Sequence, residues 1–393
     1  MSKLLLSCDE YIYKFEGRFY TESQQWLEFY QRYLRVFDEI RLALRCETVT
    51  SLKTGWVPMD LEPRIEIIPL PIFHGPLQYA KVYFKTGLII RSVVDDCDAA
   101  IVRIPSTVAM RICNQVIKRG IPYACEVVYD AEDGWRGSKG LECFLWKRID
   151  KEMRLQCYKA NGVACVTEHY LQRNYYPKTQ NSFVSHYSSI SLKHSFYGSS
   201  RSYPSHKVFV IAHTSYIIQF DGSKGANQII EALHLLKRRG IFVKVRFAGH
   251  DRNGNSLKLK ALAKKLDVED NIEFVGFLSR ESMDVFLSES DLFVMPTKAE
   301  GLPRVIIEAM AKGLPCITTP VSGNPELINS HFLVDYYDIN TLADRIEELI
   351  NNQELYEKTS EENFSRSKQY EDSILQARRD SFYKQLLDCV IKK

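Results

Sequence analysis

Several features that would assign this sequence to a simple class are absent. Its 393 residues contain no apolar run near the ~18 residues that span a bilayer. Only three consecutive leucines occur near the start, too few for a signal-peptide core. Ten cysteines are present without a C-x-x-C pair, which indicates a reducing compartment. We therefore expect a cytoplasmic protein, with peripheral contact at the inner face of the cytoplasmic membrane as a further expectation.

A strong excess of charge is also absent. The chain has 52 basic and 49 acidic side chains, a net charge of +3, too small for nucleic acid to be an expected partner. Residues 1–200 hold 26 basic and 22 acidic residues, and residues 169–220 hold no acid. The cations of that stretch are Arg173, Lys178, Lys193, Arg201 and Lys207. They suit phosphate groups or an anionic membrane surface; a solvated linker is the alternative.

Two common nucleotide-binding motifs are missing. No G-x-x-x-x-G-K-[ST] sequence occurs, and the loop expected after the first apolar run has one glycine, Gly17, where G-x-G-x-x-G would be needed. P-loop and dehydrogenase functions are therefore disfavoured. With 45% hydrophobic and 26% charged residues, the composition is otherwise that of a compact globular protein.

Short β-rich runs alternate with amphipathic helical stretches, as in parallel sheets covered by helices. The first half predicts strands at 3–8, 39–46, 64–71, 99–105, 123–130 and 162–167, and helices near 20–36, 76–95, 107–119, 138–160 and 168–175. The second half predicts strands at 207–213, 243–250, 271–277, 291–297 and 315–319, and helices near 224–239, 254–266, 279–289 and 303–312. The predicted fold class is α/β, with two doubly wound Rossmann-like domains facing across a cleft.

Composition also suggests where the domains end. Residues 195–206, SFYGSSRSYPSH, are rich in Ser, Gly and Pro and predict an interdomain linker. We expect an N-terminal domain over 1–200 and a C-terminal domain over 201–372. A final helix, 373–393, is expected to pack back toward the N-terminal domain.

The densest chemical signal lies in residues 291–328, DLFVMPTKAEGLPRVIIEAMAKGLPCITTPVSGNPELI. It predicts a strand, a glycine loop, a helix, a strand and a second glycine loop. Glu300 precedes the helix and Glu308 lies more than a turn inside it, so both carboxylates could accept hydrogen bonds from sugar hydroxyls. Alternatively, Glu300 complements the helix dipole and Glu308 is solvated, which spacing alone favours.

Lys224 indicates a site for an anion. It lies at a predicted helix start, where the dipole disfavours a cation by ~0.3–1 kcal/mol. A phosphate bound by Lys224 and the free N–H groups of the helix would reverse that sign; an exposed lysine that escapes the dipole is the alternative. The sequence Ser322-Gly323-Asn324 leads into another predicted helix, whose first N–H groups could bind a second phosphate oxygen.

The segment EGLPRVIIEAMAKGLPCITTPVSGNPELI resembles the donor site of retaining GT-B glycosyltransferases of the Glu-x7-Glu type, the glycosyltransferase group 1 family. The similarity is strong over 207–350. GRFY, IVRIPS and PYACEVVYD resemble more loosely the acceptor half of bacterial surface polysaccharide transferases. The resemblance implies an acceptor-binding N-terminal domain and a nucleotide-sugar-binding C-terminal domain. It implies a metal-independent, retaining enzyme without a cofactor. A sugar would pass from a UDP-sugar to a glycan or lipid-linked saccharide in capsular or surface polysaccharide biosynthesis.

The resemblance also implies roles for particular residues. The catalytic candidates are Glu300 at the donor sugar hydroxyls, Lys224 on the diphosphate and Asp130 near the reacting sugar. The other donor-site candidates are Glu308 at the ribose, the backbone amides of Gly323 and Asn324 at the diphosphate, Phe277 at the base, and Gly301 and Leu302. Arg103 and Gly17 are the acceptor-side candidates. For Phe277, ordinary core packing is an equally favoured alternative.

One departure from the family pattern leaves other functions open. Many relatives carry an arginine shortly before the lysine of the Lys-Gly pair, whereas none lies between Lys207 and Lys224 here. His213 could substitute only in part, because histidine is often neutral at pH 7. A catalytically decayed nucleotide-sugar-binding partner subunit is one alternative. A nucleotide-sugar epimerase is another, which the Glu-x7-Glu element argues against.

Overall fold

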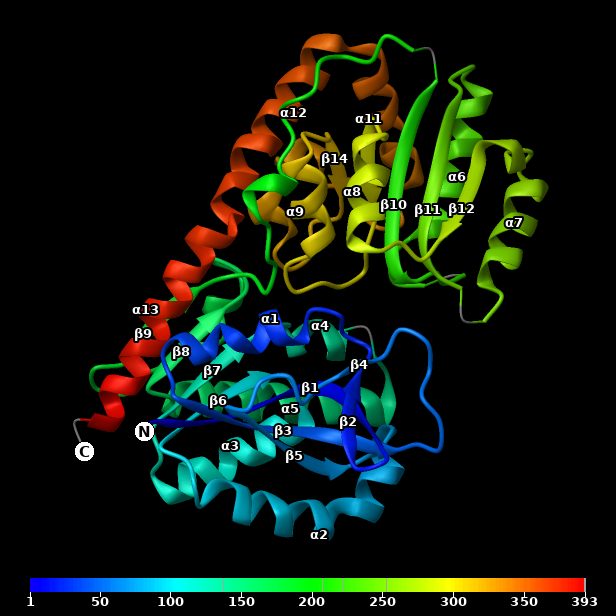
Figure 1. Ribbon diagram of the computed structural model, residues 1–393. Helices are drawn as coiled ribbons and strands as arrows, with labels where there is room; N and C mark the ends of the chain where they lie inside the picture. The colour runs from blue at the N-terminus through cyan, green and yellow to red at the C-terminus, as the bar shows by residue number, and fades with distance from the viewer. Residues whose placement is uncertain (137, 207, 221, 252, 392–393) are drawn as a thin grey trace. The chain divides into compact units, whose positions relative to one another are not determined.

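The structure is a computed structural model that describes residues 1–136, 138–206, 208–220, 222–251 and 253–391. It divides into two compact units, shown in Figure 1. The first comprises residues 1–187 and 376–393, and the second residues 188–375. Both are α/β units built on largely parallel sheets, which confirms the predicted class of two Rossmann-like domains. Each unit is described by itself.

A nine-stranded sheet forms the centre of the first unit, in the order β4-β2-β1-β6-β7-β8-β9, with β3 paired to β1 and to β5. Its strands are β1 (Lys3–Phe15), β2 (Arg18–Thr21), β3 (Glu39–Thr48), β4 (Val57–Pro58), β5 (Ile65–Pro71), β6 (Ala99–Ile104), β7 (Tyr123–Val127), β8 (Gly162–Cys165) and β9 (Phe183–His186). The helices are α1 (Trp26–Gln31), α2 (Gly75–Val94), α3 (Thr107–Arg119), α4 (Ala131–Arg136), α5 (Gly140–Lys159) and most of α13 (Asp372–Ile391).

The second unit has a five-stranded, all-parallel sheet in the order β12-β11-β10-β13-β14. Its strands are β10 (Phe209–Ile217), β11 (Val243–His250), β12 (Ile272–Gly276), β13 (Leu292–Met295) and β14 (Cys316–Thr318). The helices are α6 (Ala226–Arg238), α7 (Asn255–Lys265), α8 (Arg280–Ser288), α9 (Arg304–Ala311), α10 (Asn324–Leu327), α11 (Ile339–Asn351) and α12 (Gln353–Ser367). The strand order reverses beside β10, so the loops after β10 and β13 flank the usual ligand position of such sheets.

Local signals explain why some helices could be located from sequence. Helix α3 covers the predicted residues 107–119. The Ser106 hydroxyl caps its start by accepting a hydrogen bond from the Ala109 N–H. Gly120 ends it with a left-handed backbone, φ 66°.

The chain after residue 8 differs from the prediction. It continues as β1 to Phe15 and turns back into β2, where a loop and then a helix near 20–36 were expected. Glu16 and Gly17 have φ values of 47° and 83°, as a two-residue type I′ hairpin turn requires. Gly17 therefore serves this turn, and its acceptor-side role stays a prediction. Strands β4 and β9 were also missed. Only the short 3₁₀ turn Leu171–Arg173 lies in the helix predicted over 168–175.

The predicted linker, 195–206, lies wholly within the second unit. The Gly198 N–H donates to the Ala311 carbonyl at 2.9 Å, and the Tyr197 hydroxyl donates to the Ser367 carbonyl at 2.9 Å. Arg201 donates to the Lys312 carbonyl at 2.7 Å. Because of this packing, the units divide at 187/188 and 375/376, whereas we predicted 200/201 and 372/373. Residues 376–391 of α13 belong to the first unit.

Glu126 holds that terminal segment in the first unit. Its carboxylate is 3% exposed, forms an ion pair with Arg103, and accepts hydrogen bonds from Tyr33, Tyr187 and Tyr383 at 2.9, 3.0 and 3.0 Å. Burial and the Glu126 charge raise the pKa values of Tyr187 and Tyr383, so both hydroxyls keep the protons that they donate. The Arg103 guanidinium also lies over the Phe29 ring, 4.9 Å from its centroid. Arg103 therefore has a structural partner that the acceptor-side prediction did not anticipate.

Removing the Glu126 carboxylate should lower the stability of the first unit selectively. We expect Glu126→Ala to lower its free energy of unfolding by about 3–5 kcal/mol, because Arg103 would remain buried without its anion. Asp60→Ala is the control, since it removes an exposed ion pair with Arg18, a kind that contributes little. All four tryptophans lie in this unit, so urea unfolding followed by tryptophan fluorescence reports it directly. Equal effects of the two substitutions would contradict the assigned role of Glu126.

Candidate active site in the second unit

The loops after β10 and β13 approach each other closely. Gly225 has φ +73°, and a Cβ atom there would lie 2.1 Å from the Pro296 carbonyl oxygen. The Lys298 N–H donates to the Ser223 carbonyl at 2.8 Å. The glycine after Lys224 is therefore required both for its backbone angle and for space.

This approach brings together Lys224 and Glu300, which lie 76 residues apart. Their side chains form an ion pair, in which Lys224 is 33% and Glu300 11% exposed. The Thr297 hydroxyl also donates to Glu300 Oε1, at 3.1 Å. Lys224 is thus not an isolated cation at a helix start, because Glu300 compensates its charge. The sequence predicted both residues in one site but not their direct contact.

The same two loops lead into helices whose first N–H groups have no side-chain cap. Gly225 precedes α6 and Pro303 precedes α9, and neither position provides a capping hydrogen bond. The N–H groups of Gly301 and Leu302 donate to no acceptor among the described residues. Free N–H groups and the positive ends of two helix dipoles can bind an anion here.

The loop after β14 differs in detail from the prediction. The Gly323 N–H donates to the Gly301 carbonyl and the Asn324 N–H to the Val321 carbonyl, each at 3.0 Å. The buried Asn324 side chain donates to Thr318 Oγ1 and to the Thr319 carbonyl, both at 3.0 Å. These amides therefore brace the loop of Gly301, and the prediction that they are free to bind a diphosphate is wrong. The positive φ of Ser322, 48°, folds the loop back in this way.

Glu308 lies on α9, one helix turn beyond the uncapped start. Burial raises the pKa of its carboxyl, while the positive charges of Arg304 and Arg280 lower it. Among the described residues, no side chain or backbone group donates a hydrogen bond to this carboxylate. It can therefore accept hydrogen bonds from hydroxyl groups of a ligand.

Phe277, after β12, is 58% exposed, so the alternative of core packing is wrong. Its ring stacks on His250 with centroids 4.0 Å apart and an interplanar angle of 12°. Tyr216 packs edge-on against His250 at 5.3 Å. These rings form an exposed aromatic surface at the carboxyl edge of the sheet, suited to stacking a planar base.

His213 is a buried group on β10 whose state the sequence left open. Its Nδ1 atom bonds to the Val294 carbonyl at 2.9 Å, and its Nε2 atom has no partner among the described residues. Burial, reinforced by the Lys224 charge, lowers its pKa to about 4. His213 is therefore neutral at physiological pH and cannot replace an arginine as a cation.

Asp130 follows β7 in the first unit and is 1% exposed. Its Oδ1 atom accepts hydrogen bonds from the Glu132 N–H and the Tyr175 hydroxyl, each at 2.9 Å. The buried Oδ2 atom has no partner among the described residues. Asp130 caps the start of α4 in this structure, and its place near a reacting sugar stays a prediction.

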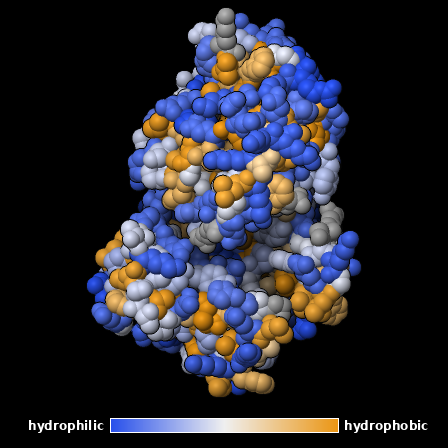
Figure 2. Space-filling model, turned by 90° about the vertical axis from the view of Figure 1, so that its right-hand side faces the viewer, coloured by the Kyte–Doolittle hydropathy of each residue, from blue (hydrophilic) through white to orange (hydrophobic). Residues whose placement is uncertain are grey.

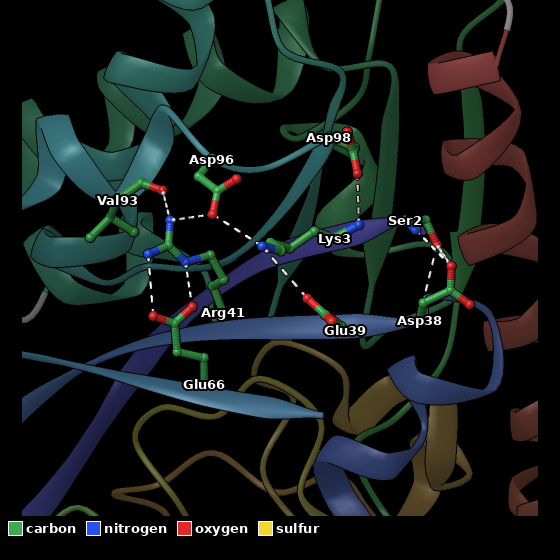
Figure 3. A network of polar contacts seen from close by, with 9 residues as sticks. All are labelled: Ser2, Lys3, Asp38, Glu39, Arg41, Glu66, Val93, Asp96 and Asp98. Atoms are coloured by element: carbon green, nitrogen blue, oxygen red, sulfur yellow. Dashed lines mark hydrogen bonds and ion pairs between the residues drawn. The ribbon is translucent and has the colours of Figure 1, made fainter. Parts of the chain in front are cut away.

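The sequence contains one D-x-D spacing, Asp96–Asp98, a motif that holds metals in other transferases. Figure 3 shows both carboxylates engaged with β1 and β3. Lys3 Nζ lies 3.0 Å and the Arg41 guanidinium 3.7 Å from Asp96, and the Lys3 N–H donates to Asp98 at 2.8 Å. These two aspartates therefore tie the sheet to the end of α2.

Within the part of the chain that the structure describes, no helix has the length and apolarity needed to cross a membrane.

Known proteins resemble this chain in sequence and in fold. Residues 214–366 match the family model described as glycosyl transferases group 1. The chain is 24% identical to Protein CapJ of Staphylococcus aureus, over 93% of this chain and 90% of that protein. It is 34% identical to the putative colanic acid biosynthesis glycosyltransferase WcaL of Salmonella typhimurium, over 32% of each protein.

Solved structures extend the likeness to the whole chain. Sucrose-phosphate synthase from Thermosynechococcus elongatus matches with a TM-score of 0.72 and 15% identity, covering 99% of this chain and 100% of that one. Anabaena HepE in complex with UDP and glucose matches with a TM-score of 0.66 and 15% identity over 100% of both chains. The fold is that of the GT-B glycosyltransferases. The match to glycosyl transferases group 1 covers residues 214–366, which lie within the second unit.

The buried, neutral His213 should make the second unit sensitive to acid. In an unfolded chain histidine titrates near 6.5, against about 4 here, so the unfolded state binds more protons between these values. This contribution to stability is complete above pH 6.5 and should fall by about 2 kcal/mol at pH 5. Urea unfolding followed by circular dichroism measures it, with tryptophan fluorescence identifying the first unit's transition. His213→Gln should flatten the profile, whereas the exposed His194→Gln should not; identical profiles would refute the assignment.

Loss of Lys224 should destabilise the protein more than loss of the Glu300 charge. Lys224→Met leaves a mostly buried carboxylate without its cation, which should cost about 1–3 kcal/mol. Glu300→Gln leaves a partly exposed ammonium that water can solvate and should cost less. Thermal unfolding of both variants without ligand gives the comparison. A Lys224→Met protein as stable as the wild type would show that the ion pair contributes nothing.

Proposed function

We propose that this chain is a metal-independent, retaining glycosyltransferase that takes a sugar from a UDP-sugar. Its acceptor would be a glycan or lipid-linked saccharide in bacterial surface polysaccharide biosynthesis. The observation that carries the proposal is the Lys224–Glu300 pair, placed just before two uncapped helix N-termini. The colanic acid relative WcaL and the UDP complex of HepE support the pathway and the donor.

In this proposal the donor binds along the carboxyl edge of the second sheet. Lys224 and the N–H groups of Gly301, Leu302 and the helix starts bind the diphosphate. Glu308 accepts hydrogen bonds from the ribose hydroxyls, for which its carboxylate is free among the described residues. Phe277 offers an exposed ring face to the uracil.

The proposed chemistry depends on charge stabilisation. When the bond from the anomeric carbon to the diphosphate oxygen breaks, negative charge develops on the diphosphate. The helix N–H groups are already in place to stabilise it, and Lys224 does so once it exchanges Glu300 for the phosphate. As Lys224 moves toward phosphate, Glu300 becomes available to the sugar hydroxyls. The acceptor hydroxyl attacks the face that the diphosphate leaves and passes its proton to the departing diphosphate oxygen, which gives retention. Asp130 is the candidate residue near that centre.

The decisive experiment is an incubation of the purified chain with a panel of nucleotide sugars in EDTA. Release of UDP from one donor, increased by a saccharide acceptor, supports the proposal, and NMR of the product gives its anomeric configuration. Binding without turnover would indicate the decayed partner subunit. Conversion to an epimeric sugar would indicate an epimerase.

The three donor-site residues should affect kinetics differently. Lys224→Ala should lower kcat/KM by about 10²–10³, the usual effect of losing one preorganised oxyanion partner. Glu308→Ala should mainly raise KM for the donor, because ribose contacts are alike in the ground and transition states. Glu300→Ala should mainly lower kcat, because it contacts the sugar that reacts. Initial rates at saturating acceptor test all three substitutions. If both Glu300→Ala and Glu308→Ala keep the wild-type kcat/KM, the donor-site assignment is wrong.

A further inference from the structure

Helix α2 of the first unit exposes a stripe of apolar side chains interspersed with cationic ones. Leu77, Phe84 and Leu88 are 84%, 82% and 66% exposed. Lys81 and Arg91 are exposed at positions between and beyond them. The spacing of 77, 81, 84, 88 and 91 places all five on one face of the helix. α2 lies at the outer side of its sheet in Figure 1, and Figure 2 shows hydrophobic groups among hydrophilic ones at that end.

Acidic residues are missing from this surface. Neither residues 67–94 nor the neighbouring helix α3 contains an aspartate or glutamate. The cations Lys81, Lys85, Arg91 and Lys118 form no ion pair with any described residue. An exposed helix of about 30 Å thus carries positive charge that nothing on its own surface neutralises.

The nearest carboxylates are already engaged. Asp95, just after α2, forms an ion pair with Arg119. Asp96 is held by Lys3 and Arg41 (Figure 3). Glu152, on α5, accepts a hydrogen bond from the Asn114 side chain at 2.6 Å. Arg119 of α3 is therefore compensated and Glu152 keeps its charge, whereas Lys81, Lys85, Arg91 and Lys118 have no carboxylate in an ion pair among the described residues.

A cavity of about 430 Å³ opens between α2 and α3 beside the apolar stripe. Phe84, Leu88, Arg91, Arg111, Asn114 and Lys118 are among the residues that line it. A Cβ atom on Gly87 would lie 2.3 Å from the Arg111 guanidinium, so the glycine makes room for that cation. Arg111 also donates to the Tyr83 carbonyl at 2.7 Å. The cavity therefore joins fixed cations to exposed apolar groups, a combination that suits a phosphate headgroup attached to acyl chains.

We propose that α2 and this cavity dock the protein on an anionic phospholipid bilayer. Phe84 and Leu88 enter the boundary between headgroups and acyl chains, and the helix lies in the interface plane. Lys81, Lys85 and Arg91 interact with the anionic surface, and Arg111 and Lys118 bind a lipid phosphate. This surface replaces the acid-free stretch 169–220 as the expected contact. That stretch is divided between the two units, and its Lys207 lies outside the described residues.

Sedimentation with vesicles tests the proposal on the full chain. We expect binding to phosphatidylcholine vesicles that contain about 30% phosphatidylglycerol, and much weaker binding to vesicles of phosphatidylcholine alone. The triple variant Lys81→Gln/Lys85→Gln/Arg91→Gln should lower the partition coefficient by about fivefold per cation, or about 100-fold. Phe84→Gln/Leu88→Gln should lower binding to the anionic vesicles and leave its salt dependence unchanged.

Matched controls lie on the second unit. Lys258→Gln/Lys264→Gln/Lys265→Gln removes the same charge from exposed positions on α7. Phe242→Gln/Leu257→Gln removes apolar groups that are 57% and 69% exposed. Both controls should keep wild-type binding, and unchanged thermal unfolding should show that every variant folds. Absent vesicle binding by the wild type, or equal losses in the α2 variants and controls, would overturn the proposal.

Discussion

The close approach of the Gly225 backbone to the Pro296 carbonyl determines how the second unit's site is assembled. A Cβ at position 225 would lie 2.1 Å from that oxygen, so only glycine lets the loops after β10 and β13 meet. Their meeting places Lys224 on Glu300. The loop after β14 then joins through the Gly323 N–H and the Gly301 carbonyl. Three loops thus come together at one edge of a parallel sheet, where the proposed diphosphate site lies.

Much of the fold follows from local sequence signals. Helix α3 begins and ends where Ser106 and Gly120 predict, and strand β11 covers the predicted residues 243–250. The parallel strands are continuous apolar runs bounded by turn residues, which is why they were recognised. The hairpin of β1 and β2 was not predicted, because a loop and then a helix were expected after residue 8. The two-residue turn has its own sequence signal, since a glycine at its second position allows positive φ.

The candidate site was predictable in its members and less so in its contacts. The Glu300 and Glu308 spacing and the Lys224-Gly225 pair were visible because each is local. The Lys224–Glu300 ion pair depends on the register of β10 against β13, which no local pattern specifies. The network of Glu126 with Arg103 and Tyr383 joins residues from distant parts of the chain in the same way. The neutral state of His213 follows from burial, which only the packed structure shows.

Calorimetric titration with UDP and with uridine, both in EDTA, tests the central claim most directly. The two ligands share base and ribose and differ in the diphosphate. If Lys224 and the helix N–H groups bind that diphosphate without a metal, UDP should bind at least about tenfold more tightly than uridine. Most of this difference should disappear in Lys224→Met. Equal affinities for UDP and uridine in the wild type would contradict the account.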